Sequence, residues 1–202
     1  MTRAPGDAYY TPAHVAARCV RWLAPRIPSV RTIVEPSVGA GAWVRAARAA
    51  WPDAVVDRYD VSPEAAGLTL DVGPQDRSVI ADWTLPTDGR RWWDLAIGNP
   101  PYQDVDVHIV RCLERSLWVA LLLRETVTGG QSRYRTLWRD HRPAWIGKLP
   151  DRVQWGGQNP HGGVDMAGAV LVVWGPRADE TQWDWIPVGE EQPGLFGGGE
   201  RE

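Results

Sequence analysis

The chain has 202 residues, of which 44% are hydrophobic, and a formal net charge of −3 at pH 7. That length can bury one sizeable core but hardly two, and no apolar run in it is long enough to cross a bilayer. Residues 1–7 carry no apolar signal segment, so we expect a cytoplasmic protein.

Strand-like and helix-like segments alternate along the chain, an order that predicts an α/β fold built on a parallel, doubly wound sheet. Apolar runs predict strands over 32–36, 54–61, 78–83, 92–98, 118–123, 144–148 and 169–174. Helices are predicted over 13–23, 107–117 and 134–139, with one more opening at the glycine-bearing turn 37–44. We expect residues 1–176 to form one domain, and the acidic, glycine-rich segment 177–202 to leave its core as a tail.

The first predicted helix has a clear start, with Thr11 as its N-cap and Pro12 at its first position. Cys19 and Cys112 lie in helical contexts and fit neither a disulfide framework nor a metal site, so we expect both in the core. The four histidines show no ligand spacing, and we expect no metal.

Polar residues follow the carboxyl ends of the first three predicted strands, where ligands bind in sheets of this kind. Glu35 precedes a turn containing Gly39 and Gly41, and Asp60 follows about 20 residues later, the spacing at which a carboxylate binds ribose hydroxyls. Asp82, at the end of the third strand, suits an adenine amine. The turn lacks the Gly-x-x-Gly continuation of a dinucleotide site, so the set favours an adenosine with an amino-acid tail and no phosphates.

The fourth predicted strand ends at Asn99-Pro100-Pro101-Tyr102. The first proline forces Asn99 out of the helical region, and the pair holds the backbone extended. Asn99 Oδ1 and the Pro100 carbonyl are then placed to accept hydrogen bonds from one planar NH2 group, while Tyr102 lies against its flat face. A strand ending in a structural Pro-Pro loop is the alternative for the tetrapeptide taken alone.

In kind and in order, these residues resemble the motifs of class I S-adenosylmethionine-dependent methyltransferases, and among them the DNA adenine-N6 methyltransferases. The resemblance covers roughly residues 9–174. The family's cofactor-binding motifs are matched by Tyr10-Thr11-Pro12, Glu35-Pro36-Ser37-Val38-Gly39-Ala40-Gly41, Asp60-Val61, Asp82-Trp83 and also Asn99. Its catalytic motif is matched by Asn99-Pro100-Pro101-Tyr102, and Arg152-Val153-Gln154-Trp155 is similar to a later motif that lines the base pocket.

The resemblance implies a Rossmann-like sheet of seven strands, mostly parallel with one antiparallel strand, and helices on both faces. It implies S-adenosylmethionine as cofactor and methyl transfer to the N6 amine of an adenine flipped out of DNA. Asn99 and Pro100 would accept the amine protons and Tyr102 would stack on the base, with Trp155 as a second stacking candidate. Three alternatives stay open: a protein glutamine amide as acceptor, an RNA base amine, or a non-catalytic cofactor-binding subunit.

The chain has no room for the separate target-recognition domain of the family's larger members. Residues 108–152 hold nine basic and four acidic side chains, a net charge of +5, whereas 179–202 have a net charge of −6. We expect recognition to come from the basic stretch between Arg124 and Arg142, from the loop 156–163, from an oligomer or from a partner.

The tail contains Gln192-Pro193-Gly194-Leu195-Phe196, with the only phenylalanine of the chain. This segment resembles the short peptides that bind the bacterial replication sliding clamp, which makes the clamp an expected partner. The alternatives are a chance match and a fold-back of Leu195 and Phe196 onto the domain.

Overall fold

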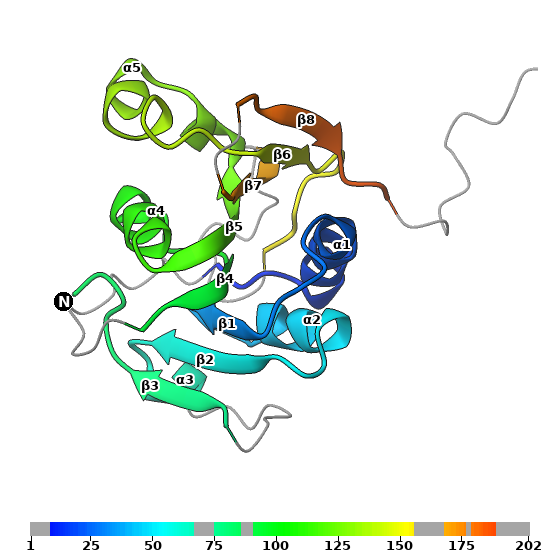
Figure 1. Cartoon of the computed structure of the whole chain (residues 1–202), viewed down its shortest axis with the longest axis vertical. Helices are drawn as coiled ribbons and strands as arrows, with labels where there is room; N and C mark the ends of the chain where they lie inside the picture. Colours follow the sequence, from blue (N-terminus) through cyan, green and yellow to red (C-terminus); the bar gives the residue numbers. More distant parts are fainter. Residues whose placement is uncertain (1–8, 67–74, 86–90, 156–167, 177–178, 189–202) are drawn as a thin grey trace, which may run out of the picture.

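The computed structural model describes residues 9–66, 75–85, 91–155, 168–176 and 179–188. Within these residues, eight strands form one sheet in the order β3-β2-β1-β4-β5-β7-β6-β8 (Figure 1). The strands are β1 Thr32–Glu35, β2 Val55–Asp60, β3 Arg77–Ile80, β4 Trp93–Gly98, β5 Ser116–Arg124, β6 Trp145–Lys148, β7 Ala169–Trp174 and β8 Gln182–Trp185. All neighbours are parallel except β7, which is antiparallel to both β5 and β6. The predicted α/β fold with a mostly parallel sheet is confirmed.

Helices cover both faces of this sheet, with α1 and α2 on one side and α4 and α5 on the other (Figure 1). Their bounds are α1 Ala13–Leu23, α2 Ala42–Ala50, α3 Pro63–Ala66, α4 Val105–Leu113 and α5 Gln131–Arg133, with short helical turns η1 Ala24–Arg26, η2 Glu125–Thr128 and η3 Tyr134–Trp138. The core has two halves because successive strand residues point to opposite faces. Thus Ile33 packs with α1 and α2, whereas the next residue, Val34, packs with α4.

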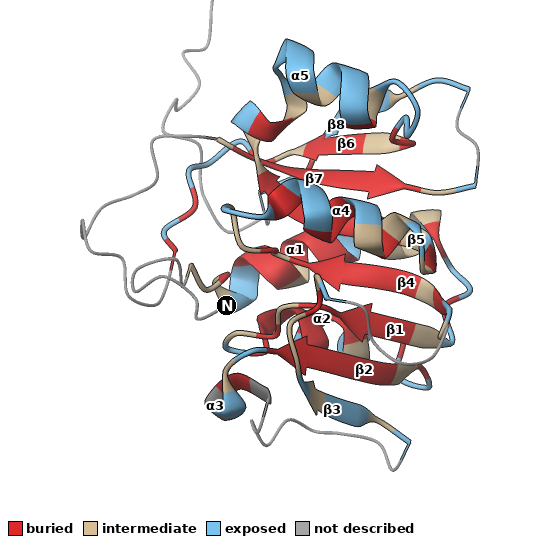
Figure 2. Cartoon of the chain, turned by 90° about the vertical axis from the view of Figure 1, so that its left-hand side faces the viewer, coloured by how far each residue is buried: buried red, intermediate tan, exposed pale blue. Residues whose placement is uncertain are grey.

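The central strands are buried on both faces and β3 at one edge is largely exposed, as Figure 2 shows. Cys19 and Cys112 are both buried, and burial raises the pKa of each thiol to about 12. Their predicted place in the core is confirmed. No helix of the described ranges is both long and apolar enough to span a membrane.

The predicted bounds of α1, residues 13–23, are confirmed, but its predicted N-cap is wrong. Pro12 is the N-cap, and the Thr11 hydroxyl accepts a hydrogen bond from Trp43 Nε1 (3.1 Å) without capping the helix. Helix α4 ends at Leu113 rather than at residue 117, because Ser116 already pairs with β4.

The third strand also ends earlier than predicted. Strand β3 stops at Ile80, two residues before Asp82. Asp82 Oδ1 instead accepts hydrogen bonds from the N–H (2.9 Å) and the hydroxyl (2.6 Å) of Thr84. Such an Asx-type turn competes with strand geometry, which explains the shorter strand.

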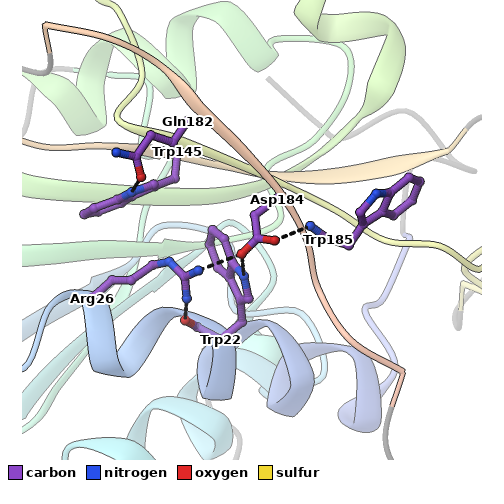
Figure 3. Close-up of polar contacts among 6 residues, drawn as sticks. All are labelled: Trp22, Arg26, Trp145, Gln182, Asp184 and Trp185. Carbon is purple, nitrogen blue, oxygen red and sulfur yellow. Dashed lines mark hydrogen bonds and ion pairs between the residues drawn. The ribbon is translucent and has the colours of Figure 1, made fainter.

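The prediction of seven strands is wrong, and so is the expectation that the whole segment after residue 176 leaves the core. Strand β8 pairs in parallel with β6 and forms the edge of the sheet. Asp184 on β8 accepts hydrogen bonds from Trp22 Nε1 (3.1 Å) and Arg26 Nη2 (2.7 Å) of α1 and η1, as Figure 3 shows. Gln182 Oε1 accepts one from Trp145 Nε1 (3.1 Å). These contacts fasten β8 to the domain.

Candidate active site

An open pocket lies at the carboxyl edge of the sheet, beyond the ends of β1 and β4. Residues 9–11, 37–40, 42, 43 and Asn99 line it. Three stretches far apart in the sequence meet here: the segment before α1, the glycine turn and the tetrapeptide after β4. Two hydrogen bonds hold the first stretch over the others, Trp43 Nε1 to Thr11 Oγ1 (3.1 Å) and Asn99 Nδ2 to the Tyr9 carbonyl (3.0 Å).

The glycine turn adopts a backbone that side chains disfavour. Gly39 and Gly41 have φ of +51° and +74°, in the left-handed region. A Cβ on Gly39 would lie 2.9 Å from Tyr10 Cδ1, so this position needs glycine for space as well. Gly41 is the N-cap of α2, which therefore begins at the pocket. The turn brings bare backbone to the place where a ligand would lie.

Asp60, the predicted ribose-binding acid, fixes this turn to the end of β2. Its carboxylate is 3% exposed and accepts hydrogen bonds from the N–H of Gly39 (2.9 Å, Oδ2) and of Ser62 (2.9 Å, Oδ1). Each oxygen keeps a second lone pair. Asp60 can therefore hold the turn and still accept a further hydrogen bond, so its predicted contact with ribose stays a prediction.

Glu35 lies fully buried at the end of β1. Neither of its carboxylate oxygens has a hydrogen-bond partner within the described residues. Burial raises the pKa of this carboxyl well above its usual range, and the nearby charge of Asp60 raises it further. Burial therefore disfavours the ionised form of Glu35 beside the glycine turn.

Asn99 stands where β4 leaves the sheet, and its amide has a defined orientation. Nδ2 donates to the Tyr9 carbonyl, which leaves Oδ1 as a buried acceptor without a partner in the described part of the chain. Pro100 is buried and Pro101 half-buried beside it. An unsatisfied buried acceptor costs about 1–3 kcal/mol, so the site gains when a donor reaches Oδ1.

Three aromatic rings, those of Tyr9, Tyr102 and Trp155, form a cluster in the same part of the fold. The Tyr102 ring centroid lies 5.4 Å from that of Tyr9 and 6.3 Å from that of Trp155, which meets it edge-on at 81°. The structure thus brings both predicted stacking residues, Tyr102 and Trp155, together. Trp155 Nε1 is buried and has no hydrogen-bond partner among the described residues.

Arg124 also belongs to this cluster. The sequence predicted it only as part of a basic surface. It is the last residue of β5, and its Cζ lies 4.2 Å from the Tyr102 ring centroid and 5.6 Å from that of Tyr9. Its position could have identified it as a site residue. It ends the strand next to β4, and neighbouring parallel strands end at the same edge of the sheet.

Other predicted site residues lie apart from the pocket. Trp83 is 2% exposed and packs in the core against Tyr59 (5.0 Å between centroids) and Trp93 (5.7 Å). Asp82 closes its own turn with Thr84, and Val61 is exposed. The structure does not bring these residues to the pocket, so their contact with an adenine ring remains a prediction.

The expected recognition surfaces are only partly described. In the basic stretch, Arg133 pairs with Asp106 (2.7 Å) and Arg139 with Asp140 (2.9 Å). The loop 156–163 and the segment Gln192–Phe196 lie outside the described residues. The sliding clamp therefore remains a predicted partner.

No family model matches the chain. It is 35% identical over 109 residues to Type II methyltransferase M.XamI of Xanthomonas campestris pv. amaranthicola, a match that covers 50% of this chain. The matched region is 20% of that protein, so this chain corresponds to about a fifth of its relative's length.

Solved structures share the whole architecture. A proposed RNA methyltransferase from Pyrococcus horikoshii has a TM-score of 0.63 at 15% identity, covering 83% of this chain and 86% of its own. A predicted O-methyltransferase from Agrobacterium tumefaciens has a TM-score of 0.58 at 19% identity, covering 84% of each chain. The plantazolicin methyltransferase BpumL in complex with SAH has 0.53 at 11%, covering 81% and 84%. At these identities the likeness establishes the fold, and the chain has the class I S-adenosylmethionine-dependent methyltransferase fold.

Proposed function

We propose that this protein transfers a methyl group from S-adenosylmethionine to the N6 amine of adenine in DNA. The observation that carries the proposal is the oriented amide of Asn99. Its Nδ2 donates to the Tyr9 carbonyl, so Oδ1 is left as a buried acceptor without a partner in the described structure. A planar NH2 group supplies the missing donor.

The pocket residues fit the cofactor. The Gly39–Gly41 turn presents backbone without side chains, and Asp60 lies behind it to hold the turn and to bind the ribose. Tyr10 and Thr11 also line the pocket, with Tyr10 packed against Gly39, and the resemblance assigns them to the methionine end of the cofactor. S-adenosylmethionine supplies an electrophilic methyl group, so no strong base is needed to generate a nucleophile.

Positioning by the chain then makes the amine reactive. Asn99 Oδ1 and the Pro100 carbonyl accept hydrogen bonds from its two N–H groups, which draws the delocalised lone pair back onto nitrogen and directs it toward the methyl carbon. When bound, S-adenosylmethionine would supply the methyl group and leave as the neutral thioether S-adenosylhomocysteine, and the amine would lose one proton to solvent. Alignment of this kind contributes up to roughly 7–11 kcal/mol of the barrier.

The aromatic cluster offers a stacking surface to an adenine that has left the base stack of DNA. Flipping a base from a duplex costs a few kcal/mol, and stacking on Tyr102 returns about 1–3 kcal/mol. Trp155 meets Tyr102 edge-on and forms the adjoining wall. Such a slot suits a flat aromatic base better than the short amide of a glutamine side chain.

Transfer of label from radiolabelled cofactor to DNA, RNA and protein, measured in parallel, tests the proposal. We expect label on adenine N6 in DNA, its loss in Asn99→Ala, and nearly unchanged cofactor binding in that variant. Tyr102→Ala should lower activity, whereas Trp92→Ala, which removes an exposed aromatic ring just before β4 at the amino end of that strand, is the matched control. Label on RNA alone or on protein alone would show that the acceptor is not DNA. Cofactor binding without any transfer would favour the non-catalytic alternative.

A further inference from the structure

The guanidinium of Arg124 occupies the angle between two aromatic rings. The centroids of Tyr9 and Tyr102 are 5.4 Å apart, and Arg124 Cζ lies 5.6 Å from the first and 4.2 Å from the second. Three such distances form a triangle rather than a line. The cation is therefore lodged in the notch between the rings, and not on a remote face of Tyr102.

This notch adjoins the acceptor oxygen of the proposed site. The Tyr9 carbonyl holds the Asn99 amide, and Tyr102 follows Asn99 by three residues. Arg124 leaves Asn99 Oδ1 without a hydrogen bond in the described structure. A planar group that carries NH2 therefore already lies against Tyr102, the ring three residues after Asn99, and Asn99 Oδ1 is still without a hydrogen bond.

Guanidinium and adenine have much in common as ligands of such a notch. Both are flat, both carry NH2 groups, and both stack on an aromatic face, the cation with an added electrostatic attraction to the ring. Two flat groups cannot occupy one face at the same time, so a base that stacks on Tyr102 from this side has to move Arg124.

We propose that Arg124 is a placeholder for the acceptor base: it stacks on Tyr102 in the free protein, is displaced by the entering base, and then binds a backbone phosphate of the same nucleic-acid strand. This inference rests on the proposed function. Arg124 stays tethered at the end of β5, at the mouth of the notch. A flipped nucleotide brings its own phosphates to that mouth, and arginine suits phosphate contacts.

Two ligands separate the stacking of Arg124 from its phosphate contact. Adenosine is neutral and carries no phosphate, whereas a short deoxyadenosine-containing oligonucleotide carries backbone phosphates. Binding of each is measured by calorimetry in the presence of S-adenosylhomocysteine, for wild type, Arg124→Ala and Arg124→Gln. Glutamine keeps a planar amide and part of the aliphatic side chain, so Arg124→Gln separates the loss of charge from the loss of packing. Arg21→Ala, which removes an exposed arginine on α1, is the matched control.

Removing the cation should change the two affinities in opposite directions. Adenosine should bind about two- to fivefold more tightly to Arg124→Ala, because a competing cation–π contact is gone. The oligonucleotide should bind more weakly, and the slope of its log affinity against log salt should fall by about 1. Arg124→Gln should show the same loss of salt slope.

Weaker adenosine binding in both variants would identify Arg124 as a fixed wall of the notch and overturn the proposal. An unchanged salt slope would overturn the phosphate contact. Failure of the proposed function has a different signature, because it appears as no transfer to DNA by the wild type, whereas these binding measurements require no transfer.

Discussion

Asp60→Asn is the most informative single change in the cofactor site. The carboxylate accepts backbone hydrogen bonds through both oxygens, from Gly39 and from Ser62. An asparagine offers only one acceptor oxygen, so one of the two N–H groups would face an NH2 group. Losing one buried hydrogen bond to a charged acceptor costs about 1.5–3 kcal/mol. We expect the free energy of unfolding to fall by about that amount, and cofactor affinity to fall because the Gly39 turn is loosened.

Urea unfolding and calorimetry with S-adenosylmethionine check the two effects separately. Asp53→Asn, an exposed acid at the opposite end of β2, is the matched control and should leave both unchanged. Direct contact with the ribose is tested by comparing S-adenosylhomocysteine with its 2′-deoxy form. If Asp60 binds that hydroxyl, the affinity difference between the two ligands shrinks in the variant. Unchanged cofactor affinity in Asp60→Asn would refute the placement of the cofactor at this turn.

Three further changes probe the rest of the pocket. Gly39→Ala should lower the free energy of unfolding by at least about 1 kcal/mol and weaken cofactor binding. The reason is that a Cβ would lie 2.9 Å from Tyr10 Cδ1, on a backbone with a φ of +51°. Thermal unfolding measures the first effect and calorimetry the second. Asn99→Asp should slow transfer by about 10²-fold or more in a single-turnover assay, because its carboxylate repels the Tyr9 carbonyl and loses its fixed orientation, while cofactor binding stays nearly intact. Glu35→Gln should change how stability depends on pH. The raised pKa of Glu35 makes the wild type lose stability as pH rises above the unfolded value near 4.5, at up to about 1.4 kcal/mol per pH unit until the folded pKa is reached. Glu35→Gln should lack this slope in urea unfolding, and a constant stability difference between the two proteins from pH 4 to 7 would contradict the raised pKa.

The sequence predicts the sheet well where strands are apolar and buried on both faces. The run that became β5 and the run that became β7 are continuous hydrophobic stretches, and both appear as predicted. β8 was overlooked because all four of its residues are exposed, so its pattern shows no buried face. Edge strands held by side-chain contacts, such as Asp184 with Trp22, leave no periodic signal in the sequence.

The candidate site was predictable where chemistry is local, and not where it depends on tertiary contacts. The tetrapeptide after β4 carries its own geometry through its prolines, so Asn99 could be singled out. That its amide nitrogen is bound by the Tyr9 carbonyl follows only from the fold, across 90 residues. The stacking of Arg124 on Tyr102 likewise depends on β5 lying beside β4.

The way β8 is attached predicts that it opens independently of the core. Its backbone pairs with β6 and with the residue before it, through Gln182 N–H to the Ala144 carbonyl (2.9 Å) and, just after β8, Ile186 N–H to the Lys148 carbonyl (2.9 Å). The side chain of Asp184 links it to α1 and η1. The hydrogen bond from the Trp22 side chain, followed by that from the Trp185 N–H, lowers the pKa of Asp184. An acid with a lowered pKa stabilises the folded state above its unfolded pKa and loses that contribution as pH falls through its folded pKa.

Acidification below pH 4 should therefore let β8 separate from β6 while the rest of the sheet stays folded. Asp184→Asn should have the same effect on β8 at neutral pH. Amide hydrogen exchange, expressed as protection factors, measures this: protection should fall at Ile186 and stay unchanged at Leu121 in the centre of β5. Glu180→Gln, an exposed acid just before β8, is the matched control. Equal loss of protection at both amides would mean that β8 unfolds only with the whole domain. In that case the sheet beyond β6 is part of a single cooperative unit, and the contacts in Figure 3 do not act as a separate fastening.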